Sequence, residues 1–293
     1  MDLVYILGKG SRWHDNEIRF SLRSAEKYFK FRNVVVIGEL PEWMQGVIHI
    51  PVEDVFKNKL QNARSKYLKA CTDSRVSDNF ILMNDDFFFL KEIEEIPYYS
   101  RGELNKQIQR HCSHAGYYFE SLKRTRDKLI GLGYTDTIFD FEVHAPIIFN
   151  KEKLKNVISV VGGLSICLLR TIYGNLQSVE KTITSDFKVG DRKQFYDQIR
   201  QKRQFLSISD SMVVCDEFRK WIWDKFPEPS KYEEDLGHGS QTSPGNAVGS
   251  MRYYAKCTFS YNNKNYQQGD LILPLEIKEI KLIKRLKDNW EFK

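Results

Sequence analysis

One tract, residues 80–90, constrains this chain more than any other, because two adjacent carboxylates separate an apolar run from an aromatic run. The apolar residues before them are typical of a buried strand. Asp85 and Asp86, preceded by Asn84, are expected at the end of that strand, because burying an unpaired carboxylate costs several kcal/mol. Such oxygen ligands suit Mg²⁺ or Mn²⁺ that is shared with substrate phosphates. An Asx-turn after a core strand is the alternative interpretation.

The first third of the chain alternates apolar strand-like runs with amphipathic helical patterns. The expected elements are strands over residues 3–7, 33–38, 47–51 and 80–83, and helices over residues 17–31 and 56–71. This alternation predicts an α/β fold with a mostly parallel central sheet and helices on both faces. Ligands of such sheets bind at the carboxyl ends of the strands, where residues 8–11 and 84–86 are both expected.

The loop after the first strand contains Lys9, Gly10 and Ser11. Its glycines let backbone amides approach a ligand closely. The loop lacks the spacing of a P-loop or a dinucleotide fingerprint. Phosphate binding and a plain β–α turn therefore both stay open.

The helix that follows this loop carries two arginines on one face. Asn16 is expected to be its N-cap, and Arg19 and Arg23 are four residues apart. Two neighbouring guanidinium groups repel each other unless an anion or a carboxylate lies between them. This face is therefore either solvated or a clamp for a diphosphate.

Three further polar residues stand out in the second half. His144 lies where an alternating stretch meets a proline, at a place where a side chain can face a cleft, although a lone histidine is more often part of a core. Arg170 lies in an apolar run, so its charge must be paired. Asp210 ends a strand expected over residues 205–210.

The bulk properties favour a soluble protein with anionic partners. The formal net charge is +6, yet no basic run is long enough to indicate nucleic-acid binding by itself. No apolar run approaches the roughly 20 residues of a membrane-spanning helix, and the N-terminus lacks the basic region of a signal peptide. The five cysteines lack the spacing of a zinc site or a disulfide framework. A cytoplasmic location is expected.

The C-terminal part is expected to be separate. Residues 237–250 have the composition of a linker, which divides a domain over residues 1–236 from a small module over residues 251–293. The module is expected to contain two strands around residues 262–263 and a final helix, and it weakly resembles SH3-like β modules.

Several of these stretches, taken in order, resemble the Stealth family, which includes bacterial capsule sugar-phosphate transferases. The stretch from Asp15 to Tyr28 is similar to the start of the family's second signature block, and the Asn-Asp-Asp tract is similar to its end. Val143-His144-Ala145-Pro146 resembles the third block. The fourth is resembled by residues 207–210 together with Phe-Pro-Glu-Pro-Ser at residues 226–230. The chain departs from the first block, where Lys9 replaces an aspartate.

This resemblance implies a GT-A-like fold that binds a nucleotide-sugar donor with a divalent cation. Asp85 and Asp86 would hold the cation, and His144 would be the general base for an acceptor hydroxyl. The other implied site residues bind the donor or complete the pocket: Lys9, Gly10, Ser11, Asn16, Arg19, Arg23, Asn84, Arg170 and Asp210.

Three functions stay open at this stage. The first is transfer of a hexose-1-phosphate to a glycan hydroxyl. The second is formation of a plain glycoside on a glycan, protein or nucleic acid by the same fold, prompted by Lys9 and the basic balance. The third is a non-catalytic binding protein from a phage or a bacterial surface.

Overall fold

The computed structural model describes residues 1–113, 116–162 and 165–234, together with five short strands between residues 253 and 292. The chain divides into two compact units, Met1–Asp235 and Leu236–Lys293. The strands of the second unit are β11 (Tyr253–Ala255), β12 (Phe259–Tyr261), β13 (Lys264–Tyr266), β14 (Leu271–Ile272) and β15 (Trp290–Phe292). The predicted linker and the final helix lie outside the described residues, so the SH3-like module stays a prediction.

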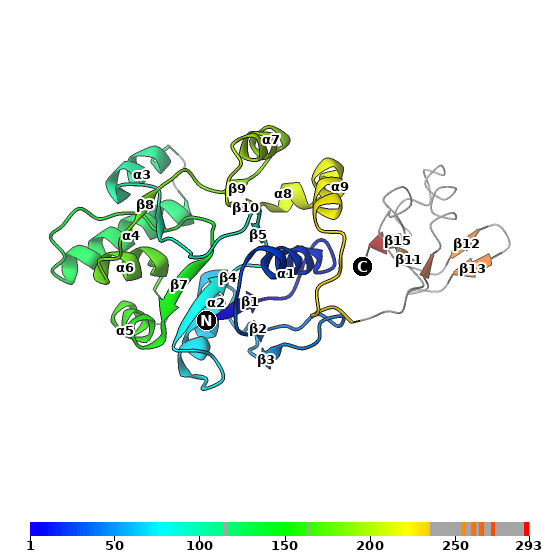
Figure 1. Cartoon of the computed structure of the whole chain (residues 1–293), viewed down its shortest axis with the longest axis horizontal. Coiled ribbons are helices and arrows are strands. Elements are labelled where there is room, and N and C mark those ends of the chain that lie inside the picture. Colours follow the sequence, from blue (N-terminus) through cyan, green and yellow to red (C-terminus); the bar gives the residue numbers. More distant parts are fainter. Residues whose placement is uncertain are drawn as a thin grey trace. The chain divides into compact units, whose positions relative to one another are not determined.

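A five-stranded sheet forms the centre of the first unit (Figure 1). Its strands, in spatial order, are β3 (Ile48–Ile50), β2 (Val34–Gly38), β1 (Asp2–Leu7), β4 (Asn79–Met83) and β7 (Ile147–Asn150). The first four are parallel and β7 is antiparallel. Their continuous apolar sequences fit strands that are buried on both faces. The predicted α/β fold with a parallel-rich sheet is confirmed.

Alternate residues of β1 pack into two different cores. Leu3 and Tyr5 face a core that includes α1 (Asn16–Tyr28), whereas Val4 faces a core that includes α2 (Lys59–Thr72) and α5 (Lys151–Val161). The side chains of successive strand residues point to opposite faces. Helices therefore cover both sides of the sheet, as the alternating pattern predicts.

A second sheet continues from the end of β4. It contains β5 (Phe87–Phe89), β10 (Phe205–Ile208) and β9 (Lys188–Val189), with β10 in the middle. A third core lies here, where Phe88 and Leu206 pack with residues of α7 (Arg192–Arg200), α8 (Asp210–Val213) and α9 (Asp216–Lys225). Because β5 and β9 both pair with β10, this sheet brings the loop that contains Asp86 close to residues 186–188.

The segment between β5 and β7 is largely helical. It contains β6 (Tyr99–Ser100), α3 (Leu104–His111) and α4 (Tyr117–Gly131), and β6 pairs with β8 (Thr182–Ile183). Leu104 of α3 and Leu122 of α4 pack against Leu168, the residue before α6 (Leu169–Leu176). These helices lie beside the β7 edge of the sheet in Figure 1.

The start of α1 differs from the prediction. Asn16 is the first helical residue, and Asp15, which has a φ of 58°, holds the N-cap position without a side-chain cap. His14 also has a positive φ, of 53°. The Ser11 hydroxyl accepts hydrogen bonds from the backbone N–H groups of Trp13 and Asp15. The prediction of Asn16 as N-cap was wrong because this left-handed turn precedes the helix.

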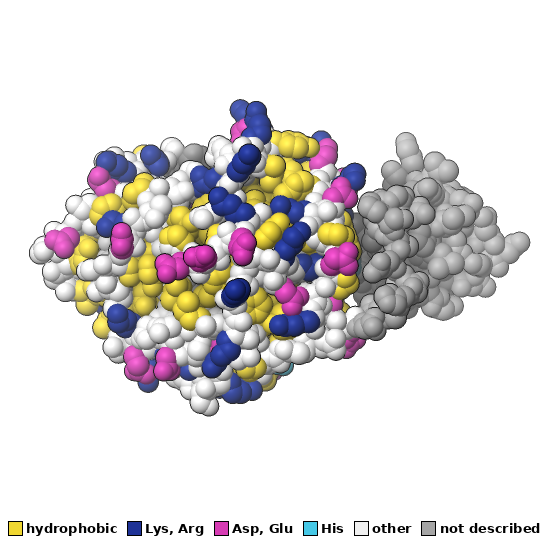
Figure 2. Space-filling model, viewed as in Figure 1, with side chains coloured by type: hydrophobic (Ala, Val, Ile, Leu, Met, Phe, Trp, Pro, Cys, Tyr) yellow, Lys and Arg dark blue, Asp and Glu magenta, His cyan; other side chains and the backbone are white. Residues whose placement is uncertain are grey.

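Charges of both signs are mixed on one face of the described residues. Figure 2 shows Lys and Arg side chains interspersed with Asp and Glu on the face that it depicts. Among the described residues, no helix has both the length and the apolar character needed to cross a membrane. Cys71, Cys112, Cys167 and Cys215 are free thiols.

Candidate active site

Three of the predicted segments meet at the carboxyl ends of the parallel strands of the central sheet, called this edge below. Tyr5 of β1 pairs with Met83 of β4, so the loop after β1 and the Asn-Asp-Asp tract leave the sheet side by side. Because β7 is antiparallel, its first residue, Ile147, pairs with Leu82 close to the end of β4. The turn that contains His144 therefore lies next to the tract. This edge is where the open α/β sheet is expected to bind ligands.

Asp85 lies in an electrostatically unfavourable place. Burial raises its pKa first, and the charges of Asp86 and Glu17 raise it further, to about 7. The backbone amides of residues 85 and 86 favour the ionised form, but less strongly. At neutral pH Asp85 is therefore partly protonated, and a cation beside it would favour the charged form.

The neighbouring carboxylates are held by polar partners. Asp86 Oδ2 accepts a hydrogen bond of 2.6 Å from Ser207 Oγ of β10 and lies 3.5 Å from Lys188 Nζ of β9. Glu17 Oε2 accepts a hydrogen bond of 2.8 Å from Ser11 Oγ. Burial raises the pKa of Glu17, and Asp15 and Asp86 add to that rise. Glu17 is thus part of the site, although the sequence indicated only a helix start.

This donor set fits a divalent cation that is shared with substrate. Mg²⁺ is commonly held by one or two carboxylates, and waters and phosphate oxygens complete its shell. No group of three or more His, Cys, Asp or Glu residues in the described ranges could hold a metal ion by itself. The carboxylates of Asp85 and Asp86 therefore offer a partial coordination shell, and the predicted cation site stays a prediction.

His144 is oriented by Asp186, the residue that precedes β9 by two positions. Asp186 Oδ2 lies 2.8 Å from His144 Nδ1, and Oδ1 accepts a 2.9 Å hydrogen bond from the His144 backbone N–H. Burial would raise the pKa of Asp186, but the hydrogen bonds and charge of His144 outweigh it, and with Arg101 they lower that pKa to about 2. An ionised carboxylate only accepts hydrogen bonds, so we assign the proton to Nδ1.

The geometry leaves the other ring nitrogen of His144 available. The His144 side chain is 35% exposed. No hydrogen bond links Nε2 to any residue in the part of the chain that the structure describes. A neutral imidazole with Nδ1 fixed by a carboxylate and Nε2 accessible has the arrangement of a general base.

Arg170 lies behind this histidine. Its Nη1 donates 2.8 Å hydrogen bonds to the carbonyl oxygens of Val143 and Ala145, the two neighbours of His144. Its guanidinium also lies 5.5 Å from the ring centroid of Phe87. Arg170 thereby ties the histidine turn to the strand that follows Asp86.

A second connection joins the carboxylates to the histidine. Lys188 contacts Asp86, and Asp186 contacts His144. Residues two apart in an extended chain are separated by about 6.6 Å. Lys188 and Asp186 therefore bring the Asp86 loop and the His144 turn, which are far apart in the sequence, to the same end of the sheet.

The two arginines of α1 are occupied by one carboxylate. Glu233 receives hydrogen bonds of 2.8 Å from Arg19 Nη1 and of 2.7 Å from both Nε and Nη2 of Arg23. Arg19 also stacks on Trp43, with its guanidinium carbon 4.1 Å from the ring centroid. The predicted need for an anion between these arginines is met by Glu233, and their role in phosphate binding stays a prediction.

The remaining predicted residues lie at or near the surface of this edge. Lys9 is exposed and lies 3.5 Å from Glu39, and Gly10 has a φ of 103°. Asn16 Nδ2 donates a hydrogen bond to the backbone carbonyl of Trp13, and the backbone carbonyl of Asn84 accepts one from the backbone N–H of Phe87. Asp210 is 74% exposed, with Arg12 at 3.7 Å.

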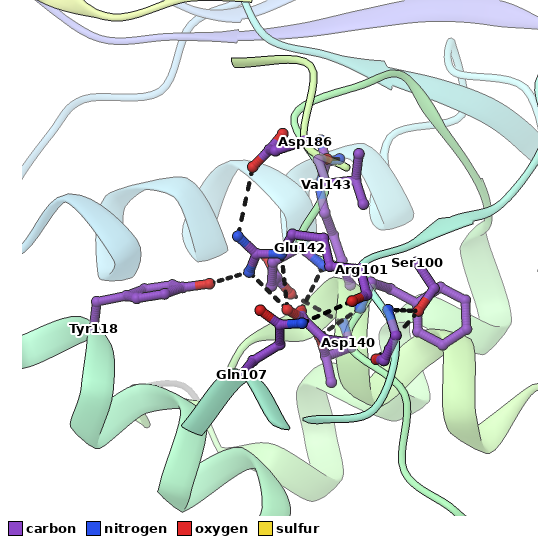
Figure 3. Close-up of polar contacts among 12 residues, drawn as sticks. Ser100, Arg101, Gln107, Tyr118, Asp140, Glu142, Val143 and Asp186 are labelled. Carbon is purple, nitrogen blue, oxygen red and sulfur yellow. Dashed lines mark hydrogen bonds and ion pairs between the residues drawn. The ribbon is translucent and has the colours of Figure 1, made fainter. Parts of the chain in front are cut away.

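A partly buried polar network surrounds Arg101 and includes Asp186, the partner of His144 (Figure 3). Arg101 lies between Asp186 and Asp140, with Tyr118 of α4 on its other side. No sequence pattern pointed to Asp186 or Arg101, because neither lies at the end of an apolar strand or in a periodic pattern. Asp140 lies in the alternating stretch before His144, but that pattern does not reveal its partners. Arg101 is 39 residues from Asp140 and 85 residues from Asp186, so only tertiary packing brings these three residues together.

Comparisons with known proteins give a partial similarity. No family model matches the chain. Human N-acetylglucosamine-1-phosphotransferase subunits alpha/beta are 32% identical over 108 residues, and the mouse protein is 31% identical over 108 residues. The similar region covers 33% of this chain and 9% of each relative. This likeness agrees with the resemblance to the Stealth family over a third of the chain.

Proposed function

We propose that the first unit is a transferase that uses a nucleotide-sugar donor and a divalent cation, and that it moves a hexose-1-phosphate to the hydroxyl of a glycan. The observation that carries this proposal is that the Asp85–Asp86 tract and the His144–Asp186 pair both lie at the carboxyl ends of the parallel strands, where Lys188, which contacts Asp86, follows Asp186 by two residues. The names of the human and mouse relatives support the same reaction class.

The order of strands suggests how a donor would lie. Neighbouring strands are about 4.8 Å apart, so His144, the Asn-Asp-Asp tract and the Gly8–Ser11 loop follow one another along the edge. The sugar phosphate would lie nearest to His144, and the nucleoside would extend towards β2 and β3. When bound, the cation would neutralise the donor phosphates.

The residues of this chain have defined tasks in that reaction. Asp85 and Asp86 would hold the cation, and Lys188 would keep Asp86 in place. His144 Nε2 would take the proton of the acceptor hydroxyl while Asp186 stabilises the imidazolium. The acceptor oxygen forms a bond to the phosphorus next to the sugar. The bond from that phosphorus to the bridging oxygen breaks, and a nucleoside monophosphate leaves.

One observation favours a second candidate, a glycosyltransferase. The loop after β1 carries Lys9, which pairs with Glu39, where the Stealth signature has an acid. In that reaction the acceptor attacks the anomeric carbon and a nucleoside diphosphate leaves.

The by-product distinguishes the two reactions. The full chain is incubated with Mn²⁺, a panel of UDP-, GDP-, ADP- and CMP-sugars, and simple glycosides, and the nucleotides and acceptors are analysed by mass spectrometry. We expect a nucleoside monophosphate and an acceptor that gains a hexose phosphate, both abolished in His144→Gln. For CMP-sugars, which hold a single phosphate, no product is expected. A nucleoside diphosphate with a plain glycoside would refute phosphate transfer, and absence of turnover with all donors would favour a binding protein.

A further inference from the structure

Arg101 joins the histidine pair to the helical segment between β5 and β7. Its Nε and Nη2 contact Asp140 Oδ2 at 2.8 and 2.7 Å, and its Nη1 lies 3.5 Å from Asp186 Oδ2. Asp140 is fully buried and the Arg101 side chain is only 14% exposed. One planar guanidinium thus spans the carboxylates of Asp140 and Asp186 (Figure 3), and of these two Asp186 contacts His144.

The helices fix Arg101 from the other side. Its Nη2 donates to the hydroxyl of Tyr118 on α4, and its carbonyl accepts a 2.7 Å hydrogen bond from Gln107 Nε2 on α3. Its backbone N–H donates to the Asp140 carbonyl at 2.9 Å. Arg101 is therefore held at its backbone and at the end of its side chain.

The carboxylate of Asp186 has to keep one orientation for His144 to work as proposed. Its Oδ1 accepts from the backbone N–H groups of His144 and Phe187, and its Oδ2 faces both His144 Nδ1 and Arg101. Rotation of this group would remove the acceptor from Nδ1 and permit the other tautomer, in which Nε2 carries the proton. A charge placed behind Oδ2 opposes that rotation.

We propose that Arg101 is a positioning residue for the His144–Asp186 pair, and that Tyr118 keeps Arg101 in place. Arg101 acts in this proposal through the orientation of Asp186. The kinetic part of the test rests on the proposed function, whereas the tautomer of His144 can be measured without turnover.

Arg101→Lys is the main variant. Lysine keeps a positive charge for the buried Asp140, but it lacks the planar fork that reaches two carboxylates. Loss of one charged contact is expected to lower kcat about tenfold while the KM of the donor stays unchanged. In ¹⁵N spectra of histidine-labelled protein, the Nδ1–H form of His144 is expected to give way partly to the Nε2–H form. An unchanged tautomer together with kcat within about twofold of wild type would overturn the proposal.

Tyr118→Phe provides a milder test in case the lysine variant does not fold. It removes only the hydroxyl that receives Arg101 Nη2, and we expect kcat to fall about threefold, with a smaller shift of the tautomer. Tyr117→Phe is the matched control, because Tyr117 lies next to it on α4 and its hydroxyl contacts Asn58 instead. Equal results for the two phenylalanine variants would overturn the role of Tyr118. If the wild type transfers no sugar phosphate, the His144 tautomer in the variants still tests whether Arg101 positions the His144–Asp186 pair. Failure of the proposed function can therefore be distinguished from failure of this inference.

Discussion

Replacing Asp85 with asparagine should stabilise the cation-free protein while removing its cation site. The pKa of Asp85 in the folded state is about 7, above its ordinary value of 3.8, because of burial and the charges of Asp86 and Glu17. Between these two pH values the folded state binds more protons than the unfolded state, so the free energy of unfolding falls as pH rises. Above about pH 7 the full cost is present. Asparagine has the same shape without the charge.

The size of this effect follows from the pKa. A difference of about 3 pK units corresponds to about 4 kcal/mol, which is an upper limit because Asp86 and Glu17 share the repulsion. We expect the variant to gain about 1–2 kcal/mol at pH 8, which for a unit of this size raises Tm by about 3–6 °C.

Thermal unfolding followed by circular dichroism, with a chelator present, measures this gain. The gain should shrink at pH 5, where Asp85 of the wild type is already protonated. Addition of Mn²⁺ should stabilise the wild type but not the variant. Asp78→Asn is the matched control, because Asp78 is exposed at the other end of β4, and it should change stability by less than about 0.5 kcal/mol at either pH. A loss of stability in Asp85→Asn at pH 8, or an equal gain at both pH values, would refute the reasoning.

Three further substitutions test other parts of the structure. Asp186→Asn should lower kcat by about 10²-fold or more, because the charge that orients His144 is lost, and a kcat near that of wild type would contradict this role. In the wild type, the stability that the Asp186 carboxylate contributes should be lost as pH falls from about 4 towards 2, and unfolding measured over this pH range would show it. Glu233→Gln should cost about 3–5 kcal/mol in urea unfolding, because it leaves the buried Arg23 and the partly buried Arg19 without their carboxylate. A loss below about 1 kcal/mol would contradict the ion-pair account. Gly174→Ala should lower the free energy of unfolding by about 1–3 kcal/mol, because the new Cβ would lie 2.5 Å from the Phe141 ring. In the control Gly131→Ala the new Cβ meets nothing within 4 Å, so stability should be unchanged or slightly higher. Equal effects of the two substitutions would contradict the packing around Gly174.

The sheet could be predicted from the sequence because its strands are buried on both faces. Continuous apolar runs such as residues 34–37 and 80–83 have few other structures available to them. The position of Asp85 and Asp86 at the end of β4 followed from the cost of burying a charge. The parallel order then placed this tract beside the loop after β1, which the structure confirms.

The partners of charged residues could not be predicted in the same way. The spacing of Arg19 and Arg23 indicated either a solvated face or an anion between them, but not that Glu233, 210 residues after Arg23, pairs with both. Asp186 likewise reaches His144 from 42 residues away, out of a segment without any periodicity. Local patterns state that a charge must be compensated, whereas tertiary packing decides which residue does so.

The most direct test of the central claim measures whether a cation at Asp85 and Asp86 lies close to His144. Mn²⁺ is added to protein labelled at the histidine rings, and the ring signals are followed by NMR, with His144→Gln providing the assignment. We predict that Mn²⁺ broadens the His144 signals and that the Asp85→Asn/Asp86→Asn double variant abolishes this effect. Mn²⁺ that binds in a manner dependent on both aspartates, yet leaves the His144 signals sharp, would contradict the claim that the two pairs form one site.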